Sequence, residues 1–188
     1  MESSLFRMIF LRKFLIEIVL FFVEKMKELF ETYAAYHIWA NKILLEKSAQ
    51  IPEEILHKET GSSFGSIYKT FVHLMEVESV WWQRLKLQEH VLMPEKDPDE
   101  NFEVLSAKLL AFSKQWSDWV QEANEKNITH VFGYQNTKKE FFKQPVYEML
   151  LHLFNHATYH RGQIITMMRQ SGIDKIPATD FIVFSRKK

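Results

Sequence analysis

Two histidines one helical turn apart are the residues of this sequence best suited to chemistry. His156 and His160 lie within residues 145–172, where apolar residues recur at the spacing of one helix face. Both fall on that apolar stripe, so their imidazoles are expected to point into the interior. Buried ring nitrogens need partners, and two neutral histidines at i and i+4 can offer theirs to one metal ion. Two hydrogen-bonded core histidines would give the same pattern. A third ligand elsewhere in the chain must therefore decide between a metal site and an ordinary histidine pair.

His73 is the candidate for that third ligand. An apolar stripe of helical spacing runs from about residue 64 to residue 88 and includes Thr70 and Val77. At roughly 100° per residue, His73 projects about 40° from Val77 and about 60° from Thr70. It therefore stands at the margin of the buried face, from which its ring can reach across to another helix. Taken alone, a partly buried histidine without a metal is the simpler interpretation.

The composition favours long helices as the elements that position these side chains. The chain has 188 residues, enough for one domain with its own core, with five glycines, five prolines and 16 phenylalanines. Few chain breakers and many large apolar residues are typical of helical proteins. The prediction is an all-α protein, a four-helix bundle with a short hairpin or loop excursion before the last helix. The helices are expected at about residues 27–48, 64–88, 98–124 and 145–172, and the excursion at residues 128–144.

A helix-start signature marks the third of these helices. Asp97 occupies the N-cap position, Pro98 the first helical position, and Glu100 follows three residues after the cap. The helix that follows carries no histidine or carboxylate at an inward position. It is therefore predicted to contribute to packing and to supply no side chain for chemistry.

Cysteine and charge counts exclude several classes of function. The chain has no cysteine, which excludes disulfide scaffolds, thiolate nucleophiles and cysteine-ligated zinc sites. This composition is typical of a reducing compartment, so a cytoplasmic location is predicted. Lys+Arg and Asp+Glu each total 24, giving a formal net charge of zero. Without a basic excess, we expect no nucleic acid among the partners.

Residues 1–25 differ from the remainder of the chain. Residues 14–23 form an apolar run interrupted by Glu17, and basic residues precede it, as in a signal peptide. No small-residue cleavage motif follows, and the run is too short and too charged at its edges to span a bilayer comfortably. We therefore divide the chain into an extension, residues 1–25, with Met26 as the natural start, and a domain, residues 26–188. An added helix or a membrane-surface anchor is the alternative, and no stable membrane association is expected.

Several short motifs together resemble a known family. They are Met26-Lys27, Tyr36-His37-Ile38-Trp39-Ala40-Asn41, Gly65-Ser66-Ile67, His73-Leu74, His152-Leu153-Phe154-Asn155-His156-Ala157-Thr158-Tyr159-His160-Arg161-Gly162-Gln163, and Pro177 with Asp180. In these segments, from about residue 26 to residue 184, the sequence resembles the DinB family of small helical proteins. The segment ending His-Arg-Gly-Gln is the most specific part. One departure is His37, where asparagine is more usual in the family.

The resemblance implies a four-helix bundle, usually a homodimer, that holds a divalent metal through three histidines. One histidine comes from the second helix and two from the fourth, which in this sequence are His73, His156 and His160. These are the same residues that the apolar spacing singles out. His152 continues the row one turn earlier and is interpreted as a neighbour of the site. We expect one divalent metal ion per chain, zinc first, with nickel, iron or manganese as alternatives.

Three neutral nitrogen ligands leave a coordination position open, which is typical of reactive zinc sites. Such an ion can lower the pKa of bound water and supply hydroxide, or it can hold an external thiol as thiolate. The resemblance implies that some relatives transfer thiols such as bacillithiol or mycothiol and that others are metal-dependent hydrolases. We expect a thiol S-transferase acting on small electrophiles. A metal-dependent hydrolase and a non-catalytic, metal-stabilised helical dimer are the alternatives.

No obvious general base accompanies the three histidines. Glu76 and Glu78 follow His73 by three and five residues, and Glu76 is more typical of a solvated face than of a catalytic position. Catalytic residues are therefore left unassigned.

Four polar residues near the histidines have possible supporting roles. Asn155 and Gln163 are candidates for hydrogen bonds to the ligands. Arg161 is expected to form a salt bridge or to contact a carbonyl group rather than to touch substrate, and Asp180 is its candidate partner. All four of these assignments are predictions from position in the sequence.

Overall fold

The computed structural model describes residues 2–88, 90–95 and 101–186. Most of the described chain is helical, and two short strands form a hairpin before the last long helix, as predicted. The elements in chain order are α1 (Glu2–Ser48), α2 (Glu53–His57), α3 (Ile67–Leu85), α4 (Phe102–Glu122), α5 (Glu125–Thr129), β1 (Val131–Gln135), β2 (Phe141–Pro145), α6 (Val146–Gln170) and α7 (Phe181–Ser185).

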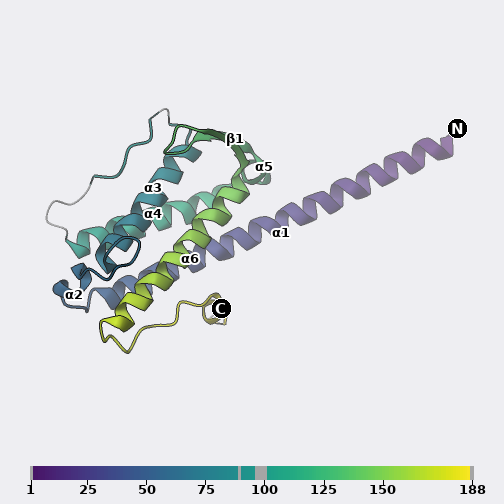
Figure 1. The fold of residues 1–188 in the computed structure, drawn as a ribbon. Helices are drawn as coiled ribbons and strands as arrows, with labels where there is room; N and C mark the ends of the chain where they lie inside the picture. Colours follow the sequence, from purple (N-terminus) through teal and green to yellow (C-terminus); the bar gives the residue numbers. More distant parts are fainter. Residues whose placement is uncertain (1, 89, 96–100, 187–188) are drawn as a thin grey trace.

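The four long helices pack around a shared interior. Helix α1 contacts α4 and α6, and α3 also contacts α4 and α6, so each long helix has two long neighbours (Figure 1). One group of buried apolar side chains lies toward α2, with Leu44, Phe71 and Ile164 among its members. A second group lies toward the hairpin and includes Trp116 and Phe154. This packing fixes α3 against α6, the two helices that carry the candidate ligands.

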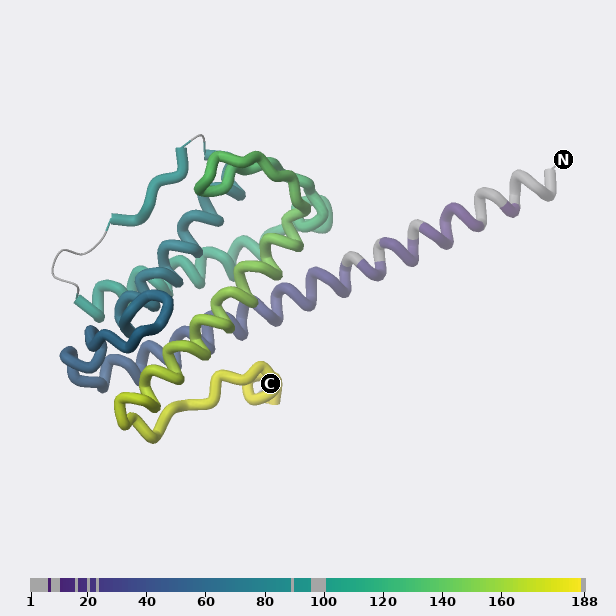
Figure 2. The backbone as a smooth tube through the Cα atoms, viewed as in Figure 1, coloured from purple at the N-terminus to yellow at the C-terminus, as the bar shows by residue number. Residues whose placement is uncertain are grey.

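The amino-terminal half of α1 extends beyond the packed helices (Figure 2). Residues 2–25 and the predicted helix at residues 27–48 form one continuous helix. Six apolar side chains of the projecting part are at least half exposed, namely Leu11, Phe14, Leu15, Val19, Phe21 and Phe22. Among the described residues, no helix combines the length and apolar character required to cross a bilayer.

Polar caps determine where α3 and α4 begin. The hydroxyl of Ser66 accepts a hydrogen bond from the backbone N–H of Lys69, so α3 begins at Ile67. The side chain of Asn101 accepts from the backbone N–H groups of Glu103 and Val104, so α4 begins at Phe102. The helix start predicted at Asp97, Pro98 and Glu100 lies outside the described residues, and the N-cap that the structure shows is Asn101.

The hairpin and the carboxy-terminal tail cover opposite sides of α6. Strands β1 and β2 pair antiparallel, with Phe132 opposite Gln144, and they place Tyr134 against α3. After α6, Gly172 adopts a φ of +80°, a left-handed conformation that glycine accepts without steric cost and that turns the chain back. The tail then docks on α1, where the hydroxyl of Tyr36 donates to the carbonyl of Thr179 at 2.8 Å.

Candidate metal centre

The structure brings the three predicted histidines together between α3 and α6. His156 Nε2 lies 3.0 Å from His73 Nε2 and 3.1 Å from His160 Nε2. One ligand atom from each of the three rings lies within 4.8 Å of the others. Among the residues that the structure describes, this group contains no carboxylate. The predicted third imidazole therefore comes from α3, as the helical spacing suggested.

The donor set fits a divalent metal ion. Zinc–nitrogen bonds of about 2.0–2.1 Å in tetrahedral geometry place neighbouring nitrogens about 3.3–3.4 Å apart. The two separations between Nε2 atoms, 3.0 and 3.1 Å, are close to that value. Three imidazole nitrogens that converge on one point can satisfy only some of their hydrogen-bonding capacity among themselves, since each pair needs one donor. A cation at that point would satisfy all three, so the cluster could hold a metal ion.

The surroundings of the cluster keep its imidazoles neutral. Burial lowers the pKa of His73 to about 4, with a smaller effect from His160. Burial also lowers the pKa of His156 to about 3, and the neighbouring histidines add to the effect. The pKa of His160 is lowered by burial as well, while its hydrogen bond to Gln163 opposes the change. Neutral imidazole is the form that binds metal, so the ligands are ready at neutral pH.

Gln163 orients His160 from one turn further along α6. The side-chain oxygen of Gln163 accepts a hydrogen bond from His160 Nδ1 at 2.7 Å. Because an amide oxygen can only accept, the proton of His160 lies on Nδ1, and the lone pair of Nε2 faces the cluster. The amide nitrogen of Gln163 donates to the hydroxyl of Tyr159 and to that of Ser63. The supporting role predicted for Gln163 is thus present in the structure.

Phe64 covers one side of the cluster. Its ring stacks on His73 at a centroid distance of 3.8 Å, and it meets His160 edge-on at 5.3 Å. The loop that carries Phe64 is closed by a hydrogen bond from Thr60 N–H to the carbonyl of Gly65. Gly65 has a φ of +83°, where a side chain would be strained. Phe64 therefore covers one face of the His73 ring with apolar surface and keeps water from that face.

His152 lies beside the cluster and does not join it. Its ring centroid is 5.6 Å from that of His156 and 5.3 Å from that of Trp81. Burial lowers the pKa of His152, and the positive charge of Arg84 adds to this effect. This position agrees with the interpretation of His152 as a neighbour. Glu76 lies on α3, half-buried and outside the cluster.

A second polar group is buried behind the histidine cluster and connects all four long helices. It joins His37 and Asn41 of α1, Glu78 of α3, Ser113 of α4 and Arg161 of α6. The side chains of His37 and Glu78 are 1% and 2% exposed, and Arg161 is 1% exposed as a residue. A buried arginine and a buried glutamate thus lie in one hydrogen-bonded network, as charges removed from water require.

The hydrogen bonds of this network have a defined direction. Arginine can only donate, so the contact between Arg161 Nη1 and His37 Nδ1 at 3.4 Å requires that Nδ1 accept. His37 then carries its proton on Nε2 and donates to the carboxylate of Glu78 at 2.9 Å. Arg161 also donates to Asn41 Oδ1 at 2.9 Å and to the hydroxyl of Thr158 at 2.8 Å. The network therefore runs from the guanidinium, through His37, to the carboxylate.

The sequence interpretation missed this network. Ser113 belongs to the helix that was predicted to contribute packing alone, and that prediction was too narrow. A signal was available, because Glu78 follows the buried Phe71 by seven residues and so falls on the same helix face. His37 and Asn41 are likewise one turn apart on the buried face of α1. Charged or polar residues on an apolar stripe predict a buried network when several helices supply them.

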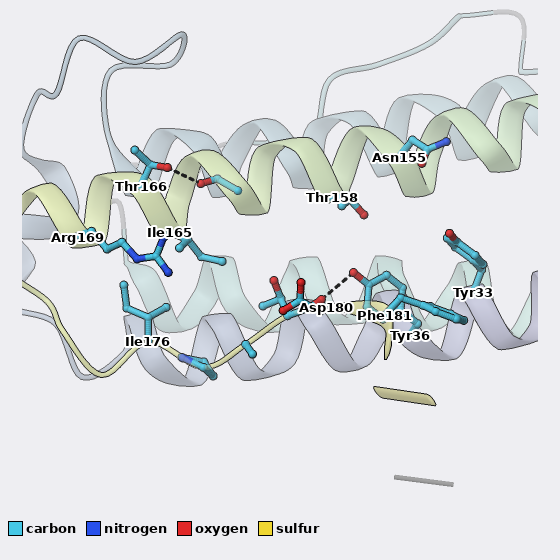
Figure 3. A pocket seen from close by; sticks show the side chains of 14 residues that line it. Tyr33, Tyr36, Asn155, Thr158, Ile165, Thr166, Arg169, Ile176, Asp180 and Phe181 are labelled. Atoms are coloured by element: carbon cyan, nitrogen blue, oxygen red, sulfur yellow. Dashed lines mark hydrogen bonds between the residues drawn. The ribbon is translucent and has the colours of Figure 1, made fainter. Parts of the chain in front are cut away.

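The remaining two candidates lie on the opposite side of α6, around a cavity of about 550 Å³ (Figure 3). Asn155 and Asp180 both line this cavity, so Asn155 does not support the ligand histidines. The other lining residues include Tyr33, Tyr36, Thr158, Ile165, Thr166, Arg169, Ile176 and Phe181.

Within the described chain, the hydrogen-bond partners of Arg161 are Thr158, Asn41 and His37, and the pairing predicted with Asp180 is absent.

Comparisons with known proteins agree with the motifs. The model of the DinB family matches residues 24–187. Protein DinB of Bacillus subtilis (strain 168) is 30% identical over 155 residues, which cover 78% of this chain and 87% of that protein. The crystal structure of a DinB-like protein from Bacillus cereus ATCC 10987 has a TM-score of 0.60 at 17% identity and covers 77% of this chain and 91% of that one, a likeness of fold. Because the family model spans the packed helices and all three clustered histidines, this chain belongs to the DinB family.

Proposed function

We propose that this protein binds one divalent metal ion, zinc first, and transfers a low-molecular-weight thiol to small electrophiles. The observation that carries the proposal is the convergence of His73, His156 and His160 on one point. All three donors are neutral, so an ion held by them would keep its full positive charge. Three protein ligands also leave room for an external ligand, which is typical of reactive rather than structural sites.

In this proposal, the three histidines would hold the ion, and an ion held there would lower the pKa of an incoming thiol so that it is thiolate at neutral pH. Gln163 keeps the lone pair of His160 directed into the cluster. Phe64 excludes water beside His73, which strengthens electrostatic interactions within the site. In the overall reaction a bond forms between sulfur and the electrophilic carbon, the leaving group departs with its electron pair, and the thiol proton passes to solvent.

The same geometry supports a metal-dependent hydrolase less well. A hydrolase of this kind gains from a general base that can reach the attacking water. Glu78, the buried carboxylate on α3, is engaged by His37, Asn41 and Ser113. It is therefore occupied in the network that connects the helices. Thiol transfer depends less on such a base, because a thiol is more acidic than water and a cation ionises it more completely at neutral pH.

The partners proposed for this chain follow from the same interpretation. They are a small electrophile, a low-molecular-weight thiol and a second copy of the chain in a homodimer. We propose that the protein acts in the cytoplasm, where such thiols are kept reduced, and that it binds no nucleic acid. A gel-shift assay at physiological salt with duplex DNA would reveal a binding activity that contradicts this last point.

Cobalt substitution tests the proposed function. The protein loaded with Co(II) is titrated with a simple thiol, and absorption from sulfur-to-cobalt charge transfer is recorded. We expect this absorption in the wild type and in His130→Ala, since His130 is exposed and lies outside the cluster. It should be absent from His156→Ala. A loaded wild-type protein that ionises no thiol would exclude the transferase, and turnover with water as sole nucleophile would favour the hydrolase.

A further inference from the structure

A cationic group in contact with two aromatic rings lies further along α3 from the histidine cluster. The guanidinium carbon of Arg84 is 4.6 Å from the ring centroid of Trp81 and 5.2 Å from that of Tyr134. The two rings are themselves 5.0 Å apart and meet edge-on. Arg84 and Trp81 come from α3, whereas Tyr134 comes from β1. The hairpin thus supplies the second of two aromatic rings in contact with the arginine, and we refer to these three residues as the Arg84 cluster.

Arg84 keeps unused hydrogen-bonding capacity in this cluster. Its Nε is buried, and within the described chain it has no hydrogen-bond partner. No ion pair of Arg84 is found among the described residues either. Aromatic rings attract the charge of a guanidinium but are not carboxylate-like acceptors for its N–H groups, which therefore remain available to an acceptor. A carboxylate suits these groups, because its two oxygens can accept in parallel.

His152 and Trp81 link the Arg84 cluster to the histidine cluster. The ring of His152 lies 5.6 Å from that of His156 on one side and 5.3 Å from that of Trp81 on the other. His152 precedes His156 by one turn, about 6 Å along α6, and Trp81 follows His73 by eight residues, about 12 Å along α3. Arg84 follows His73 by 11 residues, about 16 Å along α3, so a molecule that contacts both clusters must be elongated.

We propose that Arg84 binds the carboxylate of the thiol substrate while the sulfur of the same molecule occupies the histidine cluster. This inference rests on the proposed thiol transfer and adds to it a chemical class, a thiol that carries a carboxylate several bonds from its sulfur. Trp81 and Tyr134 hold the guanidinium in place, so little side-chain freedom is lost when the carboxylate binds. Arg84 is thereby a specificity-determining residue.

A length series of thiols tests this assignment with the Co(II)-loaded protein. Terminal mercaptoalkanoic acids of increasing chain length are compared with mercaptoalcohols of equal length, and binding is followed by the sulfur-to-cobalt absorption. The wild type should bind the acid about tenfold more tightly than the matched alcohol, the usual size of a charge-assisted hydrogen bond. The preference should peak at an intermediate length, where the molecule spans the two clusters.

Two variants and a matched control assign the preference to one side chain. Arg84→Met should abolish the preference for the acid, and Arg84→Lys should retain only part of it, because a lysine cannot bind both oxygens in parallel. Lys86 provides the control, since it lies over the ring of Trp82 rather than in the Arg84 cluster. Lys86→Met should keep the full preference. Affinity for Co(II) itself should be the same in all four proteins.

The possible failures can be told apart. Equal affinities for acid and alcohol at every length in the wild type would overturn the Arg84 assignment alone, as would an undiminished preference in both Arg84 variants. Absence of sulfur-to-cobalt absorption with every thiol would instead overturn the thiol transferase, and the assignment of Arg84 with it. A loss of Co(II) affinity in Arg84→Met would show that the residue supports the fold of the site. The acid preference of Arg84→Lys would then test the assignment, and an undiminished preference in that variant would overturn it.

Discussion

His156 occupies the middle of the histidine cluster, in contact with both other candidate ligands. Its burial, and to a smaller extent the neighbouring histidines, oppose a proton on its ring, so that its pKa is lowered to about 3. The pKa of His73 is lowered to about 4 for the same main reason. The free protein therefore keeps both rings neutral over a range of pH in which an exposed histidine would already be charged.

These lowered pKa values predict a pH dependence of stability in the metal-free protein. The folded chain takes up protons at His73 only near pH 4, whereas the unfolded chain does so near the ordinary value of 6.5. Stability should be constant above pH 6.5 and should fall as the pH is lowered from 6.5 toward 4. Urea unfolding in the presence of a chelator measures this, with His73→Phe as the comparison. If the variant lost stability as steeply as the wild type over this window, His73 would not be the source.

A second prediction for a single residue concerns Gln163, the hydrogen-bond partner of His160. Replacing Gln163 by alanine removes the acceptor for His160 Nδ1 and lets the ring change its tautomer or turn. Metal affinity should weaken by about ten- to 100-fold, as is usual when such a supporting partner is lost. Gln170→Ala, at the exposed end of the same helix, should leave the affinity unchanged. Isothermal titration with zinc compares the three proteins, and equal affinities would refute the role given to Gln163.

At the scale of elements, the buried network holds the helices that carry the ligands. His37 and Asn41 of α1 and Ser113 of α4 converge on Glu78 of α3, and Arg161 extends the network to α6. Glu78 follows His73 by five residues, and Arg161 follows His160 directly. Hydrogen bonds made by these two residues therefore connect α3 and α6 through α1, next to the histidine cluster.

Removal of the buried carboxylate should be costly. In Glu78→Ala the guanidinium of Arg161 stays buried without its counter-charge, which typically destabilises a protein by about 3–5 kcal/mol. Asp118→Asn serves as the control, because Asp118 pairs with Lys114 on the exposed face of α4, and such pairs contribute at most about 1 kcal/mol. Denaturant unfolding measures both changes. A loss from Glu78→Ala no larger than that from Asp118→Asn would mean that the network does not stabilise the fold.

Helical spacing alone predicted much of this arrangement, and the parts it missed have physical reasons. The apolar stripes located α3 and α6 and gave His156 and His160 a common face, because helix periodicity is a local property. The start predicted for the third helix, at Asp97, lies outside the described residues, and the N-cap that the structure shows is Asn101. The partners of Arg161 on α1, His37 and Asn41, could not be found by spacing, because they lie more than 100 residues away in the sequence. Such pairings depend on the packing of whole elements.

At the scale of the whole molecule, α1 is much longer than the body it packs against (Figure 1). Its projecting part bears exposed apolar side chains, whereas Met26 is partly buried against the core near the hairpin. The family model begins its match at residue 24. A folded domain that starts near Met26 stays a prediction from the sequence, and the added helix, which would be continuous with the helix of that domain, stays its alternative.

Truncation tests the independence of that domain. A chain that begins at Met26 should keep the melting temperature and the Co(II) stoichiometry of the full chain, because the described side chains before it are mostly exposed and bury little apolar surface. It should also associate less, since exposed apolar side chains favour self-association. Calorimetry and light scattering measure these properties. A clearly lower melting temperature after truncation would show that the projecting helix is part of the folded domain.

The most direct test of the central claim is elemental analysis of the protein purified without an affinity tag, loaded with zinc and dialysed. The account predicts one equivalent of zinc per chain in the wild type and in His130→Ala, and none in His156→Ala, whose ring bridges the other two ligands. Wild-type protein that retains no metal, or a His156→Ala variant that retains as much as the wild type, would contradict it.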